Sequence, residues 1–151
     1  IQYEIYIKTI NIEGQTMVEM SKRQILPAVI AYKADLADSI GSILGVDGNA
    51  DVEKVLFTSI SNFLISFNAN LVKLEKAIQK AHSMHGNTKA QAVAYRDLVV
   101  TTMGELRKDA DTLETLVDAE YWPMPTYSKL LFSVWSRWSL PATRWSNRRT
   151  P

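Results

Sequence analysis

Apolar residues recur at helical spacing in three successive parts of the chain. After one initial step of seven residues, every step is three or four residues, so each series lies along one side of a helix. Three such helices cannot hide their apolar stripes alone, and we expect them to pack on one another. The first series is Val18, Ile25, Val29, Tyr32, Leu36, Ile40 and Ile43; the second is Leu56, Ile60, Phe63, Phe67, Leu71, Leu74, Ile78 and Ala81; the third is Ala92, Tyr95, Val99, Thr102, Leu106, Ala110, Leu113 and Val117.

Turn-forming residues separate the three series. A stretch rich in Gly, Asp and Asn follows the first series, and Asn49 or Asp51 can cap the second helix. Gly86 is well placed for a left-handed cap, after which Asn87 or Thr88 can start the third helix. Short loops make consecutive helices antiparallel neighbours, and helices of roughly 30 residues are about 45 Å long. The pattern therefore predicts an all-α fold, an elongated up-down-up three-helix bundle.

Two parts of the predicted first helix are irregular. Pro27 lies inside it, where proline removes a backbone hydrogen bond and crowds the preceding turn. We expect a kinked first helix, bent near Arg23–Leu26, or a break into two helices there. Residues 1–10 are ambiguous, because their alternating apolar residues suit a strand whereas the spacing of Ile1 and Ile5 suits a helix.

The character of the chain changes after Glu120. Pro123 and Pro125 force the residues before them towards extended conformations, so this Pro-rich segment cannot continue the third helix. Its larger side chains are too apolar to stay in solvent, and we expect them to pack back onto the bundle or onto a neighbouring domain. They are Tyr121, Trp122, Tyr127, Leu130, Leu131 and Phe132.

Residues 135–151 form a basic tail that contains three of the four tryptophans and no acidic residue. Its four arginines contribute +4 to the net charge of +1, which leaves −3 on residues 1–134. We expect a helical domain over residues 1–134 and a tail that is disordered, vector-derived or frame-shifted. A basic aromatic arm for a membrane surface or nucleic acid is the alternative. The arginines are Arg137, Arg144, Arg148 and Arg149.

Length and composition narrow the class of protein. A chain of 151 residues suits one domain. The absence of cysteine excludes disulfides and thiolate chemistry, and it fits a reducing cytoplasm. No apolar run approaches the roughly 20 residues that span a bilayer, and no secretory signal is visible. Since the sequence begins at Ile1 rather than Met, we expect a piece of a longer protein.

Few residues suggest catalysis or metal binding. His82 and His85, three residues apart at the predicted end of the second helix, could share a metal ion, but two ligands do not make a site. Favourable interaction with the helix carboxyl end explains them equally well. Acidic residues on the third helix could act as acid and base or hold Mg²⁺. Their interleaving with Arg107 and Lys108 instead indicates a solvated face; they are Glu105, Asp109, Asp111, Glu114, Asp118 and Glu120.

Nucleotide-binding glycine motifs are also lacking. The aromatic residues Phe63, Phe67 and Tyr95 fit the helical stripes, so we interpret them as core residues and not as a ligand site. We therefore predict no catalytic, cofactor-binding or metal-binding residue in this chain.

Two segments resemble a known family. In the first, Asn11-Ile-Glu13 leads to Ile25-Leu-Pro-Ala28; the second is Trp122-Pro-Met-Pro-Thr-Tyr-Ser-Lys-Leu-Leu-Phe132. In this order and at this separation they resemble the carboxy-terminal helical region of type III glutamine synthetases, over roughly residues 1–134. The resemblance favours a helix for residues 1–10.

The resemblance implies a parent enzyme that ligates ammonia to glutamate, with ATP activating the side-chain carboxylate as an acyl phosphate. It also implies Mg²⁺ or Mn²⁺ as cofactors and large ring-shaped homo-oligomers. In the family the catalytic residues lie upstream, so none is carried over to this chain. We expect a non-catalytic, cytoplasmic domain that packs on the catalytic domain and neighbouring subunits, through its stripes and Trp122–Phe132. We expect no nucleic-acid or membrane partner.

The alternative is an independent helical protein-protein interaction module that takes a partner helix in an exposed apolar groove. Such a module predicts one continuous exposed apolar patch. A domain cut from an enzyme predicts instead that exposed apolar surface gathers around residues 1–29 and 121–134. A third and weaker hypothesis is a metal-dependent enzyme that uses His82 and His85.

Overall fold

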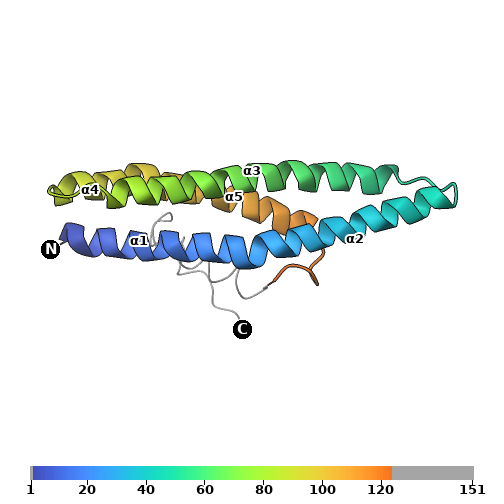
Figure 1. Ribbon diagram of the computed structural model, residues 1–151, viewed down its shortest axis with the longest axis horizontal. Coiled ribbons are helices and arrows are strands. Elements are labelled where there is room, and N and C mark those ends of the chain that lie inside the picture. Colours follow the sequence, from blue (N-terminus) through green and yellow to red (C-terminus); the bar gives the residue numbers. More distant parts are fainter. Residues whose placement is uncertain (1, 124–151) are drawn as a thin grey trace, which may run out of the picture.

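The computed structural model describes residues 2–123, and this part of the chain is all-helical, without a strand. Three helical arms lie side by side and turn back at two short loops (Figure 1). The first arm comprises α1 (Gln2–Met20), a π-helical turn (Ser21–Ile25) and α2 (Leu26–Gly45). The second arm is α3 (Asp51–His82), and the third comprises α4 (Thr88–Ala94), a π-helical turn (Tyr95–Val100) and α5 (Thr101–Leu116). The remainder of the predicted Pro-rich segment and the tail lie outside the described residues.

The start of the chain is helical, as the family resemblance favours, because α1 begins at Gln2. Around Pro27 the first arm stays helical, and the turn immediately before it, Ser21–Ile25, is a π turn. A π turn is a common place for a helix to absorb an irregularity in its hydrogen-bond ladder. The predicted break into two helices is therefore wrong, because the helical segments are contiguous and Pro27 lies in the first turn of α2, where a missing N–H costs little.

The loop residues satisfy the helix ends largely as predicted. The Asn87 side chain accepts a hydrogen bond from the Ala90 N–H at 3.0 Å and caps α4. Gly86 has φ +94°, the expected left-handed conformation, but the predicted cap is wrong, because α3 ends at His82 with Ser83 as its cap residue. At the other loop, Asn49 Oδ1 accepts a hydrogen bond from the Asp51 N–H at 2.8 Å. Asn49 lies one residue before Ala50, the cap position of α3.

The core runs along the facing sides of the three arms. Every residue of the predicted third stripe is buried, whereas Tyr32, Ile40 and Ile43 of the first stripe are half-buried. The largest fully buried side chains are Tyr95, Phe67, Ile10, Ile60, Leu71, Leu74, Leu106, Leu113, Val29 and Val99.

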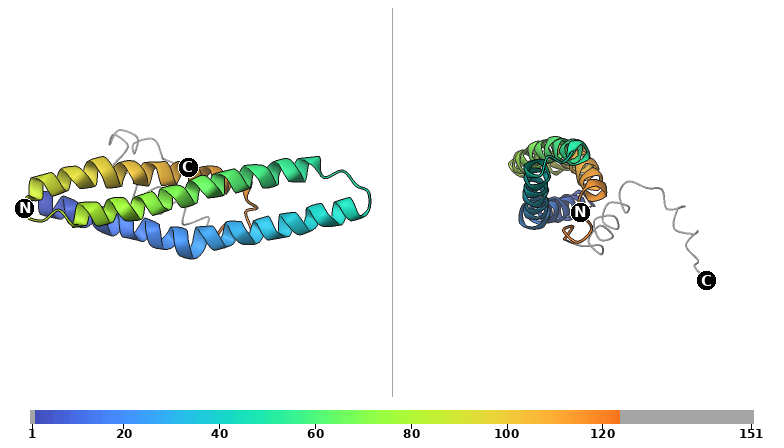
Figure 2. Two further views of the ribbon diagram at one scale, coloured as in Figure 1. Left: turned by 45° about the horizontal axis from the view of Figure 1, so that its top comes forward. Right: turned by 90° about the vertical axis from the view of Figure 1, so that its right-hand side faces the viewer.

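Phe63 is a correction to the predicted core, because 36% of its surface is exposed. A step of four residues turns a helix 40° past a full turn, which places Phe63 at the edge of the stripe that Phe67 centres. Ser66 contacts Asp109, so Phe63 lies near the last turn of α5. Beyond that point α2 and α3 continue together without the third arm (Figure 2).

Candidate functional site

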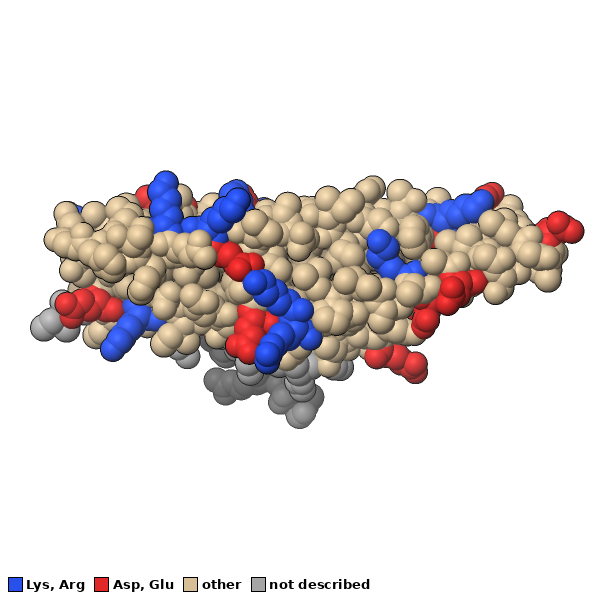
Figure 3. All heavy atoms as spheres, in the orientation of Figure 1, with Lys and Arg blue, Asp and Glu red and all other residues tan. Residues whose placement is uncertain are grey.

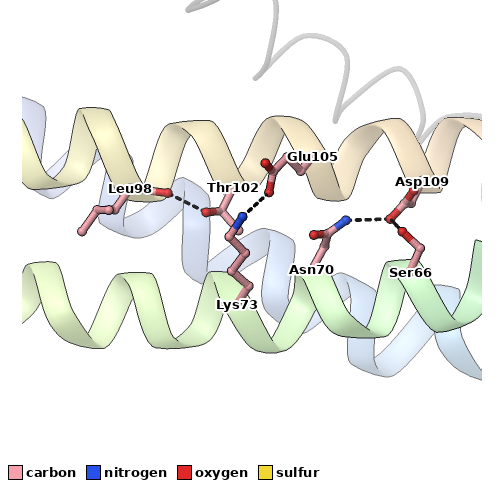
Figure 4. Close-up of polar contacts among 7 residues, drawn as sticks. All are labelled: Ser66, Asn70, Lys73, Leu98, Thr102, Glu105 and Asp109. Carbon is pink, nitrogen blue, oxygen red and sulfur yellow. Dashed lines mark hydrogen bonds and ion pairs between the residues drawn. The ribbon is translucent and has the colours of Figure 1, made fainter.

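The polar contacts between α3 and α5 lie along one seam (Figure 4). Asp109 accepts hydrogen bonds from Ser66 Oγ and Asn70 Nδ2, each at 2.7 Å, and Asp109 and Asn70 are half-buried. Two donors on one carboxylate are charge-assisted hydrogen bonds, which are shorter and stronger than neutral ones. They hold α5 in one register on α3.

One ion pair extends the same seam. Lys73 Nζ lies 2.7 Å from Glu105 Oε2, with side-chain exposures of 58% and 40%. A pair as exposed as this contributes about 0–1 kcal/mol. The double hydrogen bond of Asp109 is therefore the stronger link across the seam.

The predicted solvated face of the third helix is partly wrong. Glu105 and Asp109 contact α3, whereas Asp111 stays at the surface, 3.5 Å from Arg107. A single helix pattern cannot say where a neighbouring helix lies, so all the acids look alike in sequence. The missed signal is on α3, where Ser66 and Asn70 are uncharged polar residues four positions apart beside the apolar stripe.

Thr102, the polar member of the third stripe, is buried, with 3% exposed. Its Oγ1 donates to the Leu98 carbonyl oxygen at 2.7 Å (Figure 4). Leu98 lies in the π turn that precedes α5. This bond satisfies the hydroxyl, so Thr102 serves packing and does not act as a free polar group.

The first arm contacts the other two arms through residues in and beside the family segment. The Tyr95 hydroxyl donates to Asn11 Oδ1 at 3.3 Å. Gly14 is buried, and a Cβ there would lie 3.0 Å from Ile78 Cδ1 and 3.4 Å from Val99 Cγ1. The absence of a side chain at Gly14 thus lets α1 approach α3 and the third arm closely. The Asn-Ile-Glu segment has a structural role here.

Tyr95 makes stability sensitive to alkaline pH. Burial raises the pKa of its phenol above the ordinary value of 10.0, and burial also raises that of Tyr6. The protonated phenol makes its full contribution to the free energy of unfolding below about pH 10, the pKa of tyrosine in the unfolded chain. This contribution is lost as the pH rises through the folded pKa. Tyr95→Phe should flatten the loss of unfolding free energy as the pH rises above about 10, leaving the part due to Tyr6.

Urea titrations across that range measure the slope. The matched control is Tyr3→Phe, whose ring is 47% exposed and which should keep the wild-type slope. Equal slopes in the wild type and Tyr95→Phe would contradict the prediction.

The segment after α5 folds back onto the bundle. The backbone turns extended at Val117, and the N–H groups of Tyr121 and Trp122 both donate to the Asp118 carbonyl oxygen, at 2.9 and 3.1 Å. The Tyr121 ring lies 5.4 Å from that of Tyr32 on α2. Trp122 is 9% exposed and belongs to the core. For these two residues the predicted packing is confirmed; Tyr127 to Phe132 lie outside the described residues.

The two histidines do not lie as predicted. His82 ends α3, but His85 lies beyond the helix in the loop before Gly86. Their ring centroids are 6.0 Å apart in an edge arrangement. Within residues 2–123, no three His, Asp or Glu side chains are grouped as a metal site would require. We derive no catalytic step from these residues.

Among residues 2–123, the exposed apolar surface differs from the distribution predicted for an excised domain. Tyr3, Ile5 and Ile12 are exposed within residues 1–29, but Trp122 is buried and most of the other exposed residues lie on or beside α2 and α3. Packing against α1, α2 and α5 covers one side of α3 and leaves its other side exposed. The large exposed apolar residues on or beside α2 and α3 are Ile30, Leu44, Val46, Val52, Val55, Phe63, Ile65 and Val72.

By length and composition, α3 is the one described helix that could cross a membrane. The sequence pattern alone conceals this, because Ser, Thr and Asn interrupt the apolar residues, although residues 55–72 contain no charge. Core helices of soluble proteins meet the same criterion. The absence of a membrane partner accordingly stays a prediction.

The described residues form an all-helical domain whose helices pack on one another. They contain no group of three side chains that could hold a metal ion. Residues 1–43 match the family described as the glutamine synthetase C-terminal domain. Along most of its length the chain is similar to type-3 glutamine synthetase, which confirms the resemblance to the C-terminal helical domain of these enzymes.

Three relatives carry this similarity. The chain is 30% identical over 141 residues to the type-3 glutamine synthetase of Dictyostelium discoideum, covering 87% of this chain and 19% of that protein. It is 35% identical over 142 residues to a glutamine synthetase of Butyrivibrio fibrisolvens, with coverages of 88% and 20%. For the glutamine synthetase of Bacteroides fragilis (strain YCH46) the identity is 25% over 139 residues, with coverages of 88% and 19%. The chain thus spans about a fifth of the length of these relatives. No solved structure matches it significantly.

Proposed function

We propose that this chain is the C-terminal structural and oligomerisation domain of a glutamine synthetase and is itself non-catalytic. The observation that carries the proposal is the similarity to type-3 glutamine synthetase over 87% of the chain. In the complete enzyme, ammonia would be ligated to glutamate at the expense of ATP, with Mg²⁺ or Mn²⁺, in the cytoplasm. The domain would pack on the catalytic domain and on neighbouring subunits of a homo-oligomer.

The use of the family segments supports a structural role. Asn11 and Gly14 pack α1 on the other arms, and Trp122 closes the core after α5. An up-down-up order of the arms, with a kink near Arg23–Leu26, belongs to the same proposal, since it presents a long surface for docking.

The first test is the coding sequence upstream of Ile1 in the native gene. We expect an open reading frame that encodes an ATP- and glutamate-binding region. A start codon close to Ile1, with nothing before it, would contradict the proposal.

Assembly provides the second test. In the complete enzyme, deletion of residues 1–134 should reduce the size of the oligomer in light scattering and lower glutamine formation. The control replaces only residues 135–151 and should keep both. An oligomer of unchanged size after deletion would rule out the oligomerisation role.

A helical interaction module is the second candidate, favoured by the exposed apolar residues of α3 such as Val55 and Ile65, which are 67% and 69% exposed. A large exposed apolar surface commonly marks a protein contact. If the upstream region encodes no enzyme, this second candidate replaces the first.

A further inference from the structure

A second stripe of uncharged side chains lies on α3, on the side opposite its core stripe. We call its six residues the outer stripe; they follow steps of three, four, three, four and three residues, and all are exposed. The whole run 55–72 contains no Asp, Glu, Lys or Arg, and Figure 3 shows an uncharged area over the middle of α3. The outer stripe consists of Val55, Thr58, Asn62, Ile65, Ala69 and Val72.

This spacing is that of a helix–helix seam. Alternating steps of three and four residues are the a and d positions of a heptad, through which two helices pack side chains into one another. The core residues Ile60, Phe67 and Leu74 recur every seven residues on the opposite side. The outer stripe is therefore a separate surface and not an edge of the core.

We propose that a second copy of this chain packs on the outer stripe, with the two α3 helices antiparallel about a twofold axis between Asn62 and Ile65. Each Asn62 then lies opposite the Ile65 of the other copy. In the same way Val55 faces Val72, and Thr58 faces Ala69. This pair of helices would be one of the subunit contacts in the function proposed above. Its place in an enzyme rests on that proposed function.

Charged residues just beyond the two ends of the outer stripe favour the antiparallel orientation. The same steps extend to Asp51 before the stripe and to Lys76 after it, and both side chains are exposed. In an antiparallel pair, Asp51 of each copy lies opposite Lys76 of the other. A parallel pair would place Asp51 against Asp51 and Lys76 against Lys76, which repel one another.

The middle of the stripe limits the strength of the contact. A polar Asn at an a position lowers the stability of a coiled coil. Only Val55, Ile65 and Val72 are larger aliphatic residues, so the isolated chain should dimerise weakly, with a dissociation constant of about micromolar or higher. Tethering within a larger assembly would raise the effective concentration of the partners.

Sedimentation equilibrium of the full 151-residue chain tests the contact. The wild type should show a monomer–dimer equilibrium, and Ile65→Lys should raise the dissociation constant at least about tenfold, because it buries a charge in the seam. Ile65 is 69% exposed, so circular dichroism should show an unchanged helical fold. The matched control is Ile12→Lys on α1, where the side chain is 63% exposed; this variant should dimerise like the wild type.

Introduced cysteines test the orientation, since the natural chain has none. The double variant Thr58→Cys and Ala69→Cys should form an intermolecular disulfide on oxidation. Within one chain these positions are separated by about 16 Å of helix, too far for a disulfide. Ala69→Cys alone should stay monomeric on a non-reducing gel.

Three results would overturn the proposal. They are a monomeric wild type at every concentration, cross-linking of Ala69→Cys alone, and equal dimerisation of the wild type and Ile65→Lys. Binding of the wild type to phosphatidylcholine vesicles without self-association, lost in Ile65→Lys, would also overturn it and assign the stripe to a lipid surface. None of these results affects the upstream reading frame, which tests the proposed function separately.

Discussion

Phe67→Ala should lower the free energy of unfolding by about 3–5 kcal/mol, the range for removing a fully buried aromatic side chain. Phe67 is 0% exposed and belongs to the core where α3 meets the other arms. The substitution removes the buried ring and leaves a cavity that rigid neighbouring helices fill only partly. Because the stability of a single domain is itself about 5–15 kcal/mol, this loss is a large share of it.

The matched control for Phe67 lies one turn away on the same helix. Phe63 has the same side chain but is 36% exposed, so Phe63→Ala should lower the free energy of unfolding by about 1 kcal/mol. Urea denaturation followed by circular dichroism measures both. Equal losses would show that both rings are core residues, as the apolar pattern alone predicts, and would contradict the structure.

Asp109→Ala should lower the free energy of unfolding by about 2 kcal/mol, because it removes two charge-assisted hydrogen bonds across the α3–α5 seam. Ser66 and Asn70 lose their common acceptor. Since Asn70 is half-buried, water replaces the lost contact only in part.

Asp111→Ala is the matched control for the seam. This residue lies two positions further along α5 and pairs with Arg107 at 3.5 Å at the surface. Desolvation raises the pKa of Asp111 above its ordinary value and Arg107 offsets this only in part, so its carboxylate gives no net stabilisation at neutral pH. In thermal unfolding, the melting temperature of Asp109→Ala should lie well below that of the wild type, and that of Asp111→Ala should lie near it. The reverse order would mean that Asp109 lies on a solvated face.

The hydrogen bonds that Asp109 accepts from Ser66 and Asn70 also show where sequence reasoning falls short. The helical period of the third arm identifies its apolar stripe correctly, and every residue of that stripe is buried. The same period places six acids together on the remaining surface, although Glu105 and Asp109 bind α3. Which part of a polar surface meets a neighbour depends on the angle between two helices, and no single helix encodes that angle.

The exposed residues of α3 illustrate the same limit. Sequence spacing assigns Phe63 to the core because it counts steps of three and four without the 40° that each step of four adds. The outer stripe has the spacing of a core stripe and yet all of its residues are exposed, since they lie on the side of α3 opposite its buried residues. Periodicity identifies surfaces that can pack, but it does not say which of them packs within the chain.

The sequence by itself determined the all-helical class, the three apolar series and the family resemblance, and it narrowed the start of the third helix to Asn87 or Thr88, because these depend on local spacing and on short segments. Only the tertiary structure decided that the first arm passes Pro27 unbroken, that Asp109 links two helices, and that one side of α3 stays open. These features arise from contacts between residues that are far apart in the chain. Their energies depend on how whole helices are placed against one another, which local pattern does not contain.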